Sequence, residues 1–218
     1  MGPTLTMENF DTDKILLKIL DELQNEHDCH TAILYGSRTR GDANHQSDYD
    51  LVGLRDKEPN IAVAKPVEGY FADAFVYSDA YVEKHLPDFL RLRGGRVLFQ
   101  RGNQGTKLLS QVEALYRKGP TPLREDEILQ KRTWIDKSFQ RVLRGDVEAQ
   151  YRRHCLLFNL LEDYFALRGI WYRGPTESFR YLSEFDSRAL RYFEAALAPG
   201  AKESDIKKLC ELVKSTKG

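Results

Sequence analysis

The hydrophobic pattern divides the chain into two parts of different character. Up to about residue 100, short apolar runs typical of β-strands alternate with polar connections and a few helical stretches. From residue 105 onward, apolar positions recur at helical spacing almost throughout. Glycines and prolines between 102 and 122 mark the change, so we predict a first domain at 1–110 and a helical domain at 120–218.

The first part is predicted to begin with an amphipathic helix and to contain four strands. The helix, residues 12–26, has one apolar face, and Asp11 or Thr12 is expected to cap its start. Two prolines favour a loop over residues 55–66, and a third interrupts a helix over 79–93. The predicted strands cover residues 31–35, 47–54, 69–77 and 96–100.

The second part is predicted to be helical, with glycine and proline residues between the helices. One of these helices is expected to break near Asp186. Strands and helices that occur in separate stretches of the chain are typical of the α+β class. The predicted helices cover residues 105–118, 123–144, 146–168, 176–197 and 203–216.

One stretch of the first part combines a tight turn with two carboxylates. The strand at 31–35 is followed by Gly36, which allows a sharp strand-to-helix turn, and by Ser37, which can cap the next helix. Free N–H groups at a helix start attract anionic oxygens. Ten residues further on, Asp48 and Asp50 lie two apart on a strand and therefore point to one face. Such carboxylates repel each other unless a cation lies between them, and their hard oxygens suit Mg²⁺, so the stretch matches a nucleoside triphosphate with its metal.

The same residues carry a family resemblance. Gly36-Ser37, ten further residues and then Asp48-Tyr49-Asp50 resemble the signature of the DNA polymerase β-type nucleotidyltransferase superfamily. Within it, the chain is most similar to small bacterial members: the kanamycin-type and the minimal nucleotidyltransferases, which include antitoxin-type protein adenylyltransferases. The resemblance is sharp over residues 33–54 and general elsewhere. It implies an α+β architecture in which a nucleotidyltransferase fold, a small mixed β-sheet with flanking helices, precedes a C-terminal α-helical bundle.

A lone carboxylate in a later strand is the third acidic candidate. Asp73 is the only charge in the predicted strand at 69–77, where it shares a face with aromatic residues. Burying such a carboxylate without a cation or donors is costly. The resemblance implies a third metal-binding acid on a neighbouring strand, and we assign this role to Asp73 by its position. The alternative is a partly exposed aspartate with no role in chemistry.

The resemblance implies in-line attack of an acceptor hydroxyl on the α-phosphorus of a nucleoside triphosphate, with ATP as the expected donor and pyrophosphate as the product. Two Mg²⁺ ions are expected to stabilise the attacking and leaving oxygens. Asp48 and Asp50 would hold the nucleotide-bound ion. Asp73 would help to hold the ion that activates the acceptor, or would act as the general base.

The phosphate groups are expected to bind at the turn. Gly36 and Ser37 would contact the β- and γ-phosphates, and Arg38 and Arg40 would neutralise phosphate charge. For both arginines, a solvated surface position is the alternative.

The helical part offers one candidate for the acceptor side. Glu162 lies on a helical stripe formed by Tyr151, Cys155, Phe158 and Phe165. An acid on an apolar face either pairs with a buried arginine or faces a cleft, where it can abstract a proton. Because kanamycin-type enzymes carry a catalytic glutamate on their helical domain, the resemblance makes Glu162 the candidate base. Glu148 and Asp163 are competitors, and a structural role for Glu162 is the alternative.

Composition limits the partners and the compartment. Lysine plus arginine equals aspartate plus glutamate, at 33 each, which argues against a dedicated duplex-DNA binder. Three scattered cysteines without a CxxC pair favour reduced thiols in a cytoplasmic protein, and no apolar run is long enough to span a membrane. His27, Cys29 and His30 are close in sequence, and we interpret them as a polar connection in preference to a metal site. The oligomeric state, including a homodimer, stays open.

Other functions were weighed against nucleotidyl transfer. The sequence from Asp48 to Val52 also fits the motif of haloacid-dehalogenase-type phosphatases, but the residues before it are polar where that motif follows a buried strand. A P-loop is excluded, because no Lys-Ser/Thr follows a glycine loop. A non-catalytic, antitoxin-like binding partner has no need of three costly carboxylates. Small-molecule modification and protein adenylylation differ only in the acceptor, and the appended helices favour an acceptor site within the chain.

Overall fold

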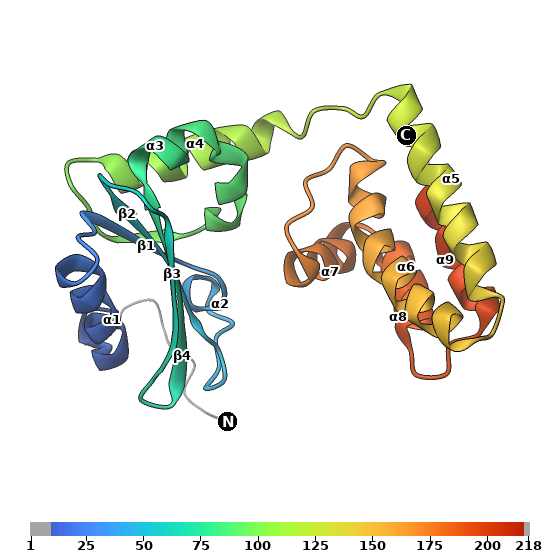
Figure 1. Cartoon of the computed structure of the whole chain (residues 1–218), viewed down its shortest axis with the longest axis horizontal. Coiled ribbons are helices and arrows are strands. Elements are labelled where there is room, and N and C mark those ends of the chain that lie inside the picture. The colour runs from blue at the N-terminus through green and yellow to red at the C-terminus, as the bar shows by residue number, and fades with distance from the viewer. Residues whose placement is uncertain (1–9, 216–218) are drawn as a thin grey trace. The chain divides into compact units, whose positions relative to one another are not determined.

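The computed structural model describes residues 10–215 of the 218-residue chain as two compact units, Met1–Lys118 and Gly119–Gly218 (Figure 1). The first unit includes the whole of helix α4 (Gln104–Lys118), inside which the predicted first domain ends. Each unit has its own buried core. The α+β class is confirmed, with a small mixed sheet and flanking helices ahead of a helical bundle. Within the described residues, no helix combines the length and the apolar character that crossing a membrane requires.

A five-stranded mixed sheet forms the centre of the first unit, in the order β3-β4-β2-β1-β5. Strands β2 and β4 are parallel and the other neighbours are antiparallel. Four of the strands fall where the sequence predicts them: β1 (Thr31–Tyr35), β2 (Tyr49–Arg55), β4 (Tyr70–Ser78) and β5 (Arg96–Phe99).

The fifth strand, β3 (Ile61–Val67), covers the second half of the segment predicted to be a loop, so that prediction is wrong there. Exposure alternates along β3, as expected for a strand with one face on the sheet's core. The strand lies at the edge and pairs only with β4. Proline lacks an N–H group, but an edge strand has donors that need no partner, so Pro66 is tolerated here.

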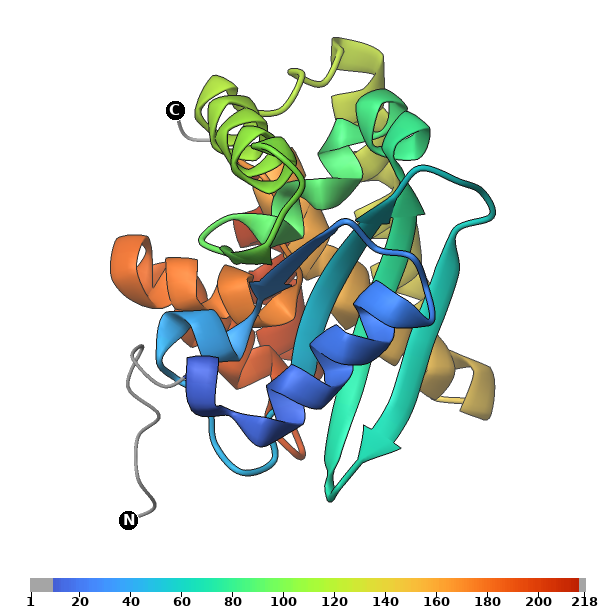
Figure 2. The same cartoon turned by 90° about the vertical axis from the view of Figure 1, so that its left-hand side faces the viewer.

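Helix α1 (Lys14–Asn25) covers one face of the sheet, as Figure 2 shows. Its buried residues Leu16, Ile19 and Leu23 recur at helical spacing. The cap is Asp13, whose side chain accepts hydrogen bonds from the backbone N–H groups of residues 15 and 16. The prediction of a cap at Asp11 or Thr12 is therefore wrong by one or two positions.

The opposite face of the sheet is covered by α3 (Asp79–Lys84), the 3₁₀ helix η2 (Leu86–Leu92) and α4. The helix predicted over 79–93 is interrupted at His85, just before Pro87, as expected from the proline. Together these elements bury Val52, Phe89 and Leu92 against this face.

The second unit is a helical bundle around one core. Five helices make it up in the described residues: α5 (Glu125–Val142), α6 (Val147–Ala166), α7 (Pro175–Phe185), α8 (Ser187–Leu197) and α9 (Glu203–Lys214). The predicted break near Asp186 is confirmed, because this residue separates α7 from α8. Its carboxylate caps α8 by accepting from the Ala189 N–H group, and it also accepts from the Tyr164 hydroxyl at 2.6 Å.

Candidate functional site

Two of the predicted carboxylates lie opposite each other on neighbouring strands. The parallel register of β2 and β4 pairs Asp50 with Asp73, and on its other side Asp50 pairs with Tyr35 of β1. Paired residues of adjacent strands point to the same face of a sheet. Asp48, two residues before Asp50 and just ahead of β2, is exposed on the approach to this face. The structure therefore brings Asp50 and Asp73 to one end of one face, and Asp48 is near enough for its charge to raise the pKa of Asp50.

The electrostatics of these acids are unfavourable in the protein alone. Burial and, to a lesser extent, the negative charges of Asp73 and Asp48 together raise the pKa of Asp50 to about 6, against the lowering effect of Arg40 and Arg38. Within residues 10–215, no hydrogen bond or ion pair reaches any of the three carboxylates. A partly buried carboxylate beside two like charges is a costly arrangement unless something cationic binds there.

A divalent cation fits this donor set. Carboxylate oxygens are the hard ligands that Mg²⁺ prefers, and here they are not used by any protein donor. The three acids do not meet within 4.8 Å of one another, since only one group in the described residues satisfies that distance and it lies elsewhere. Their side chains would therefore have to rotate toward a shared ion.

The turn before α2 (Ser37–Arg40) lies directly against the Asp50 carboxylate. Gly36 has φ +76°, and a Cβ atom there would lie 2.2 Å from Asp50 Oδ2, so both the backbone conformation and the space require glycine. Gly36 is also the N-cap of α2, which corrects the prediction that Ser37 caps this helix. Ser37 is instead its first residue, and its hydroxyl makes no hydrogen bond with the part of the chain that the structure describes.

Arg38 is buried, with 4% of its surface exposed, so its interpretation as a solvated surface residue is wrong. Its guanidinium donates to the backbone carbonyls of Ser47 and Asp48, at 2.7 and 3.0 Å, and lies 3.5 Å from the centre of the Tyr49 ring. These contacts fix the loop that leads into β2. Arg40 is exposed and lies 3.4 Å from the carboxylate of Asp42.

The structure adds two residues that the sequence analysis missed. Tyr35 is buried beside Asp50, and burial raises the pKa of its hydroxyl to about 12. Arg91 of η2 lies over the same face, where its guanidinium is 5.8 Å from the Tyr35 ring and donates to the Tyr77 hydroxyl at 2.8 Å. The strand register would have revealed Tyr35. Arg91 is brought here by a long-range contact, for which the sequence holds no local signal.

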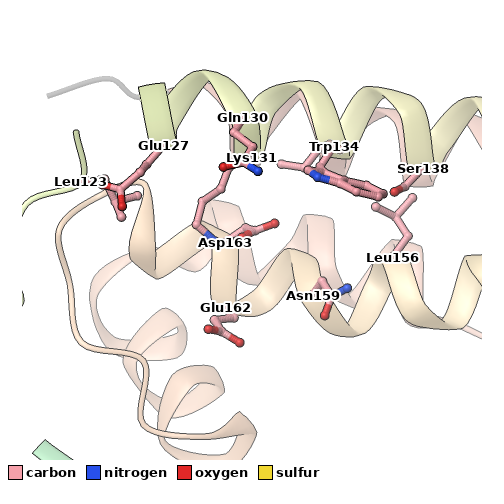
Figure 3. A pocket seen from close by; sticks show the side chains of 11 residues that line it. Leu123, Glu127, Gln130, Lys131, Trp134, Ser138, Leu156, Asn159, Glu162 and Asp163 are labelled. Carbon is pink, nitrogen blue, oxygen red and sulfur yellow. Dashed lines mark hydrogen bonds and ion pairs between the residues drawn. The ribbon is translucent and has the colours of Figure 1, made fainter. Parts of the chain in front are cut away.

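Glu162 lies in the second unit and lines a pocket of about 430 Å³ between α5 and α6 (Figure 3). It is exposed and has no ion pair among the described residues. Both of its competitors are paired: Asp163 accepts from Lys131 at 2.6 Å, and Glu148 accepts from Arg152 at 2.7 Å. Polar and aromatic groups share the pocket wall with it, among them Gln130, Trp134, Ser138 and Asn159.

The apolar stripe that was predicted around Glu162 is not a buried face. Tyr151 and Phe158 are 72% and 70% exposed, and Cys155 is exposed as well. Of the stripe, only Phe165 is buried. The core-facing residues of α6 lie on another side of the helix: Ala149, Leu156, Leu157, Leu160, Leu161, Tyr164 and Phe165.

Comparison with known proteins finds similarity among solved structures. No protein-family model matches the sequence, and no curated protein matches it. Among the solved structures that match is a nucleotidyltransferase-like protein from Exiguobacterium sibiricum 255-15, with 14% identity and a TM-score of 0.42. The match covers 90% of this chain and 71% of that chain. A likeness this distant assigns no role to any residue, so the roles proposed below are inferred from the chain's own side chains.

Proposed function

We propose that the first unit transfers a nucleoside monophosphate from a nucleoside triphosphate, with ATP as the expected donor, to an acceptor hydroxyl, and that pyrophosphate is released. One observation supports this most strongly. Three carboxylates without protein partners converge on one sheet face beside the Gly36 turn, and the pKa of Asp50 among them is raised. Function is a common reason for such an arrangement, because it costs stability unless a ligand binds.

The three acids are proposed to have different roles according to their positions. Asp48 and Asp50 are proposed to hold the metal ion that accompanies the triphosphate, and Asp73 to complete the site beside the attacking hydroxyl or to take its proton. Bound Mg²⁺ would neutralise phosphate charge and stabilise the attacking and leaving oxygens. Because Asp50 and Asp73 are paired on neighbouring strands, their backbone positions are fixed relative to each other, and only their side chains need to rotate toward a bound ion.

The turn and its arginines are proposed to orient the phosphates. The Ser37 hydroxyl is available to donate to a phosphate oxygen, and Arg40 is exposed beside it. Arg38 acts differently, because its guanidinium is already bound to two backbone carbonyls. It is a positioning residue that holds the loop before Asp48 and contributes a fixed positive charge.

Glu162 is proposed to contact the acceptor or to act as a base toward it. It is the one of the three candidate acids on α6 that has no cationic partner in the described residues. A protein acceptor is the second candidate, since the exposed rings of Tyr151 and Phe158 on the same helix favour contact with a macromolecule.

The experiment is a transfer assay with the full chain, Mg²⁺ and each α-³²P-labelled nucleoside triphosphate. Small hydroxylated molecules and cell lysate serve as separate acceptor pools, and pyrophosphate release is followed in parallel. We expect label transfer that Asp50→Asn abolishes and that Asp21→Asn, the same change on the exposed side of α1, leaves intact. Label on a protein band would select the second candidate. Equal transfer by Asp50→Asn and the unaltered chain would contradict the proposal.

A further inference from the structure

A second group of metal-ligating side chains lies at the other end of the same sheet. His30 immediately precedes β1, Asp56 follows β2, and Asp79 is the first residue of α3 after β4. In the antiparallel register, the His30 end of β1 lies beside Leu54, whereas its Tyr35 end lies beside Asp50. The length of β1 therefore separates this group from the proposed catalytic carboxylates.

The three side chains converge. One ligand atom from each lies within 4.8 Å of the other two, and His30 Nε2 is 3.3 Å from Asp79 Oδ2 and 4.0 Å from Asp56 Oδ1. In the described residues, no other group of three histidine, cysteine, aspartate or glutamate side chains meets this distance.

The state of the His30 ring is the second observation. Its side chain is only 10% exposed, yet Nε2 is buried without a hydrogen bond while it faces the two carboxylates. The other ring nitrogen, Nδ1, lies 3.0 Å from the Thr31 hydroxyl oxygen, which holds the ring in this orientation. A histidine whose one nitrogen is anchored and whose other nitrogen faces carboxylate oxygens has the arrangement found around metal ions.

We propose that His30, Asp56 and Asp79 bind one divalent transition-metal ion of the Zn²⁺ type. An imidazole nitrogen with carboxylate oxygens suits such ions, whereas Mg²⁺ prefers oxygen ligands alone. Three protein ligands leave a position for water. The ion would join the start of β1, the end of β2 and the start of α3, so its first effect is to fasten this end of the sheet.

Arg101 occupies the same carboxylates when no metal is bound. Its guanidinium donates to both oxygens of Asp56, at 2.6 and 2.7 Å, and lies 3.4 Å from Asp79 Oδ2. Two carboxylates and one guanidinium leave a formal charge of −2 + 1 = −1, which still favours a cation. Half of the Arg101 side chain is exposed, so it can move into solvent when an ion displaces it.

Replacing Arg101 should have different effects on metal affinity in a metal site and in a simple ion-pair network. If the group is a metal site, removing the competing guanidinium strengthens metal binding. If it is only an ion-pair network, the same change leaves two repelling carboxylates and no specific affinity.

The test is calorimetric titration of Zn²⁺ into the tag-free, chelator-treated full chain. An Asp50→Asn background removes the central carboxylate of the other acidic group and so weakens any competing binding there. We expect one site that His30→Ala weakens by at least about tenfold and that Arg101→Gln strengthens by about tenfold. His27→Ala, which alters a neighbouring histidine outside the group, should leave the affinity unchanged.

Asp56→Asn guards against a folding defect in the His30 variant, because 69% of the Asp56 side chain is exposed and its replacement leaves the core untouched. It should weaken binding as His30→Ala does, with an unchanged circular dichroism spectrum. No saturable Zn²⁺ binding, or binding that neither His30→Ala nor Asp56→Asn weakens, would overturn the proposal. So would an Arg101→Gln variant that binds no more tightly than the background.

Discussion

The acidic side chains of the two candidate sites lie in contrasting surroundings. On the sheet face of the first unit, Asp48, Asp50 and Asp73 have no protein partner in the described residues, and the pKa of Asp50 is raised. In the pocket of the second unit, Asp163 is paired with Lys131, and Glu127 accepts from a backbone N–H group at the start of α5. Unpaired, partly buried charge reduces stability, whereas paired charge at a helix surface costs little.

Unpaired acids are therefore the residues that we expect to bind ligands, and paired acids are those that we expect to stabilise the fold. The unpaired charge of Asp50 destabilises the folded protein, and we expect a bound cation and triphosphate to offset this cost. Most of the second unit's charges are satisfied without a ligand, and Glu162 is the exception in its pocket. Replacing an unpaired acid of the first unit should therefore lower activity and raise stability. Replacing one partner of an ion pair in the second unit should lower stability.

The largest effect is expected from Gly36→Ala. The new Cβ atom would lie 2.2 Å from Asp50 Oδ2, and φ +76° disfavours any side chain, so the carboxylate must move. Displacement of a catalytic group by about 1 Å costs on the order of 100-fold in rate, and we expect at least this loss of nucleotidyl transfer. Gly41→Ala is the matched control, because φ there is +81° but nothing lies within 4 Å of the added atom. Equal activity of the two variants would show that the turn does not position Asp50.

The next effect concerns the core of the second unit. Leu160 is fully buried among the bundle helices, so Leu160→Ala should lower the free energy of unfolding by about 2–5 kcal/mol. Phe158→Ala, two residues earlier but 70% exposed, should change it by less than about 0.5 kcal/mol. Hydrogen exchange should show lost protection in α6 and in its neighbour α5 of the Leu160 variant, whereas the protection of β1 should not change. Parallel loss in β1 would contradict the independence of the two cores.

Asp50→Asn should raise the free energy of unfolding, whereas Leu160→Ala lowers it, and should abolish nucleotidyl transfer. The folded protein disfavours the ionised form of the Asp50 carboxyl, because its pKa is raised from 3.8 to about 6. The resulting loss of folding stability is absent well below pH 3.8, grows as the pH rises to about 6 and is complete above that. With allowance for partial exposure, the gain at pH 7.5 in EDTA is about 1–2 kcal/mol. Urea unfolding at pH 3.5 and at pH 7.5 measures it. A gain of the same size at both values would show that charge is not the cause.

The smallest effect is expected where the charges are already paired. Lys131 and Asp163 are joined at 2.6 Å and are both partly buried, so Lys131→Met should lower the free energy of unfolding by about 0.5–1 kcal/mol. The double variant Lys131→Met/Asp163→Leu should recover most of the loss, because it leaves no unpaired carboxylate. A Lys131→Met variant that is more stable than the unaltered chain would show that this ion pair does not stabilise the second unit, and would contradict the contrast with the unpaired acids of the first unit.

Much of the site follows from local sequence, because the short spacing of Asp48 and Asp50 keeps them near each other and Asp73 is the single charge in its strand. The parallel pairing of Asp50 with Asp73 depends on tertiary contacts, and no local pattern encodes it. The same holds for the convergence of His30, Asp56 and Asp79 from three separate segments.

The errors of the sequence analysis have physical causes. The prolines predict a loop at 55–66, but an edge strand tolerates proline, as β3 does. The helical spacing of the aromatic residues predicts a buried stripe, whereas Tyr151 and Phe158 lie on the exposed side of α6 and a row of leucines faces the core. Hydrophobicity alone cannot choose between two apolar faces of one helix.

The central claim is that Asp48, Asp50 and Asp73 bind a metal–nucleotide complex. The most direct measurement is calorimetric titration of a non-hydrolysable ATP analogue into the full chain, with Mg²⁺ and again with EDTA, for the unaltered protein and for Asp50→Asn. We expect saturable binding by the unaltered chain with Mg²⁺ only, and binding at least about 100-fold weaker by Asp50→Asn. Binding that persists in EDTA, or that Asp50→Asn leaves unchanged, would contradict it.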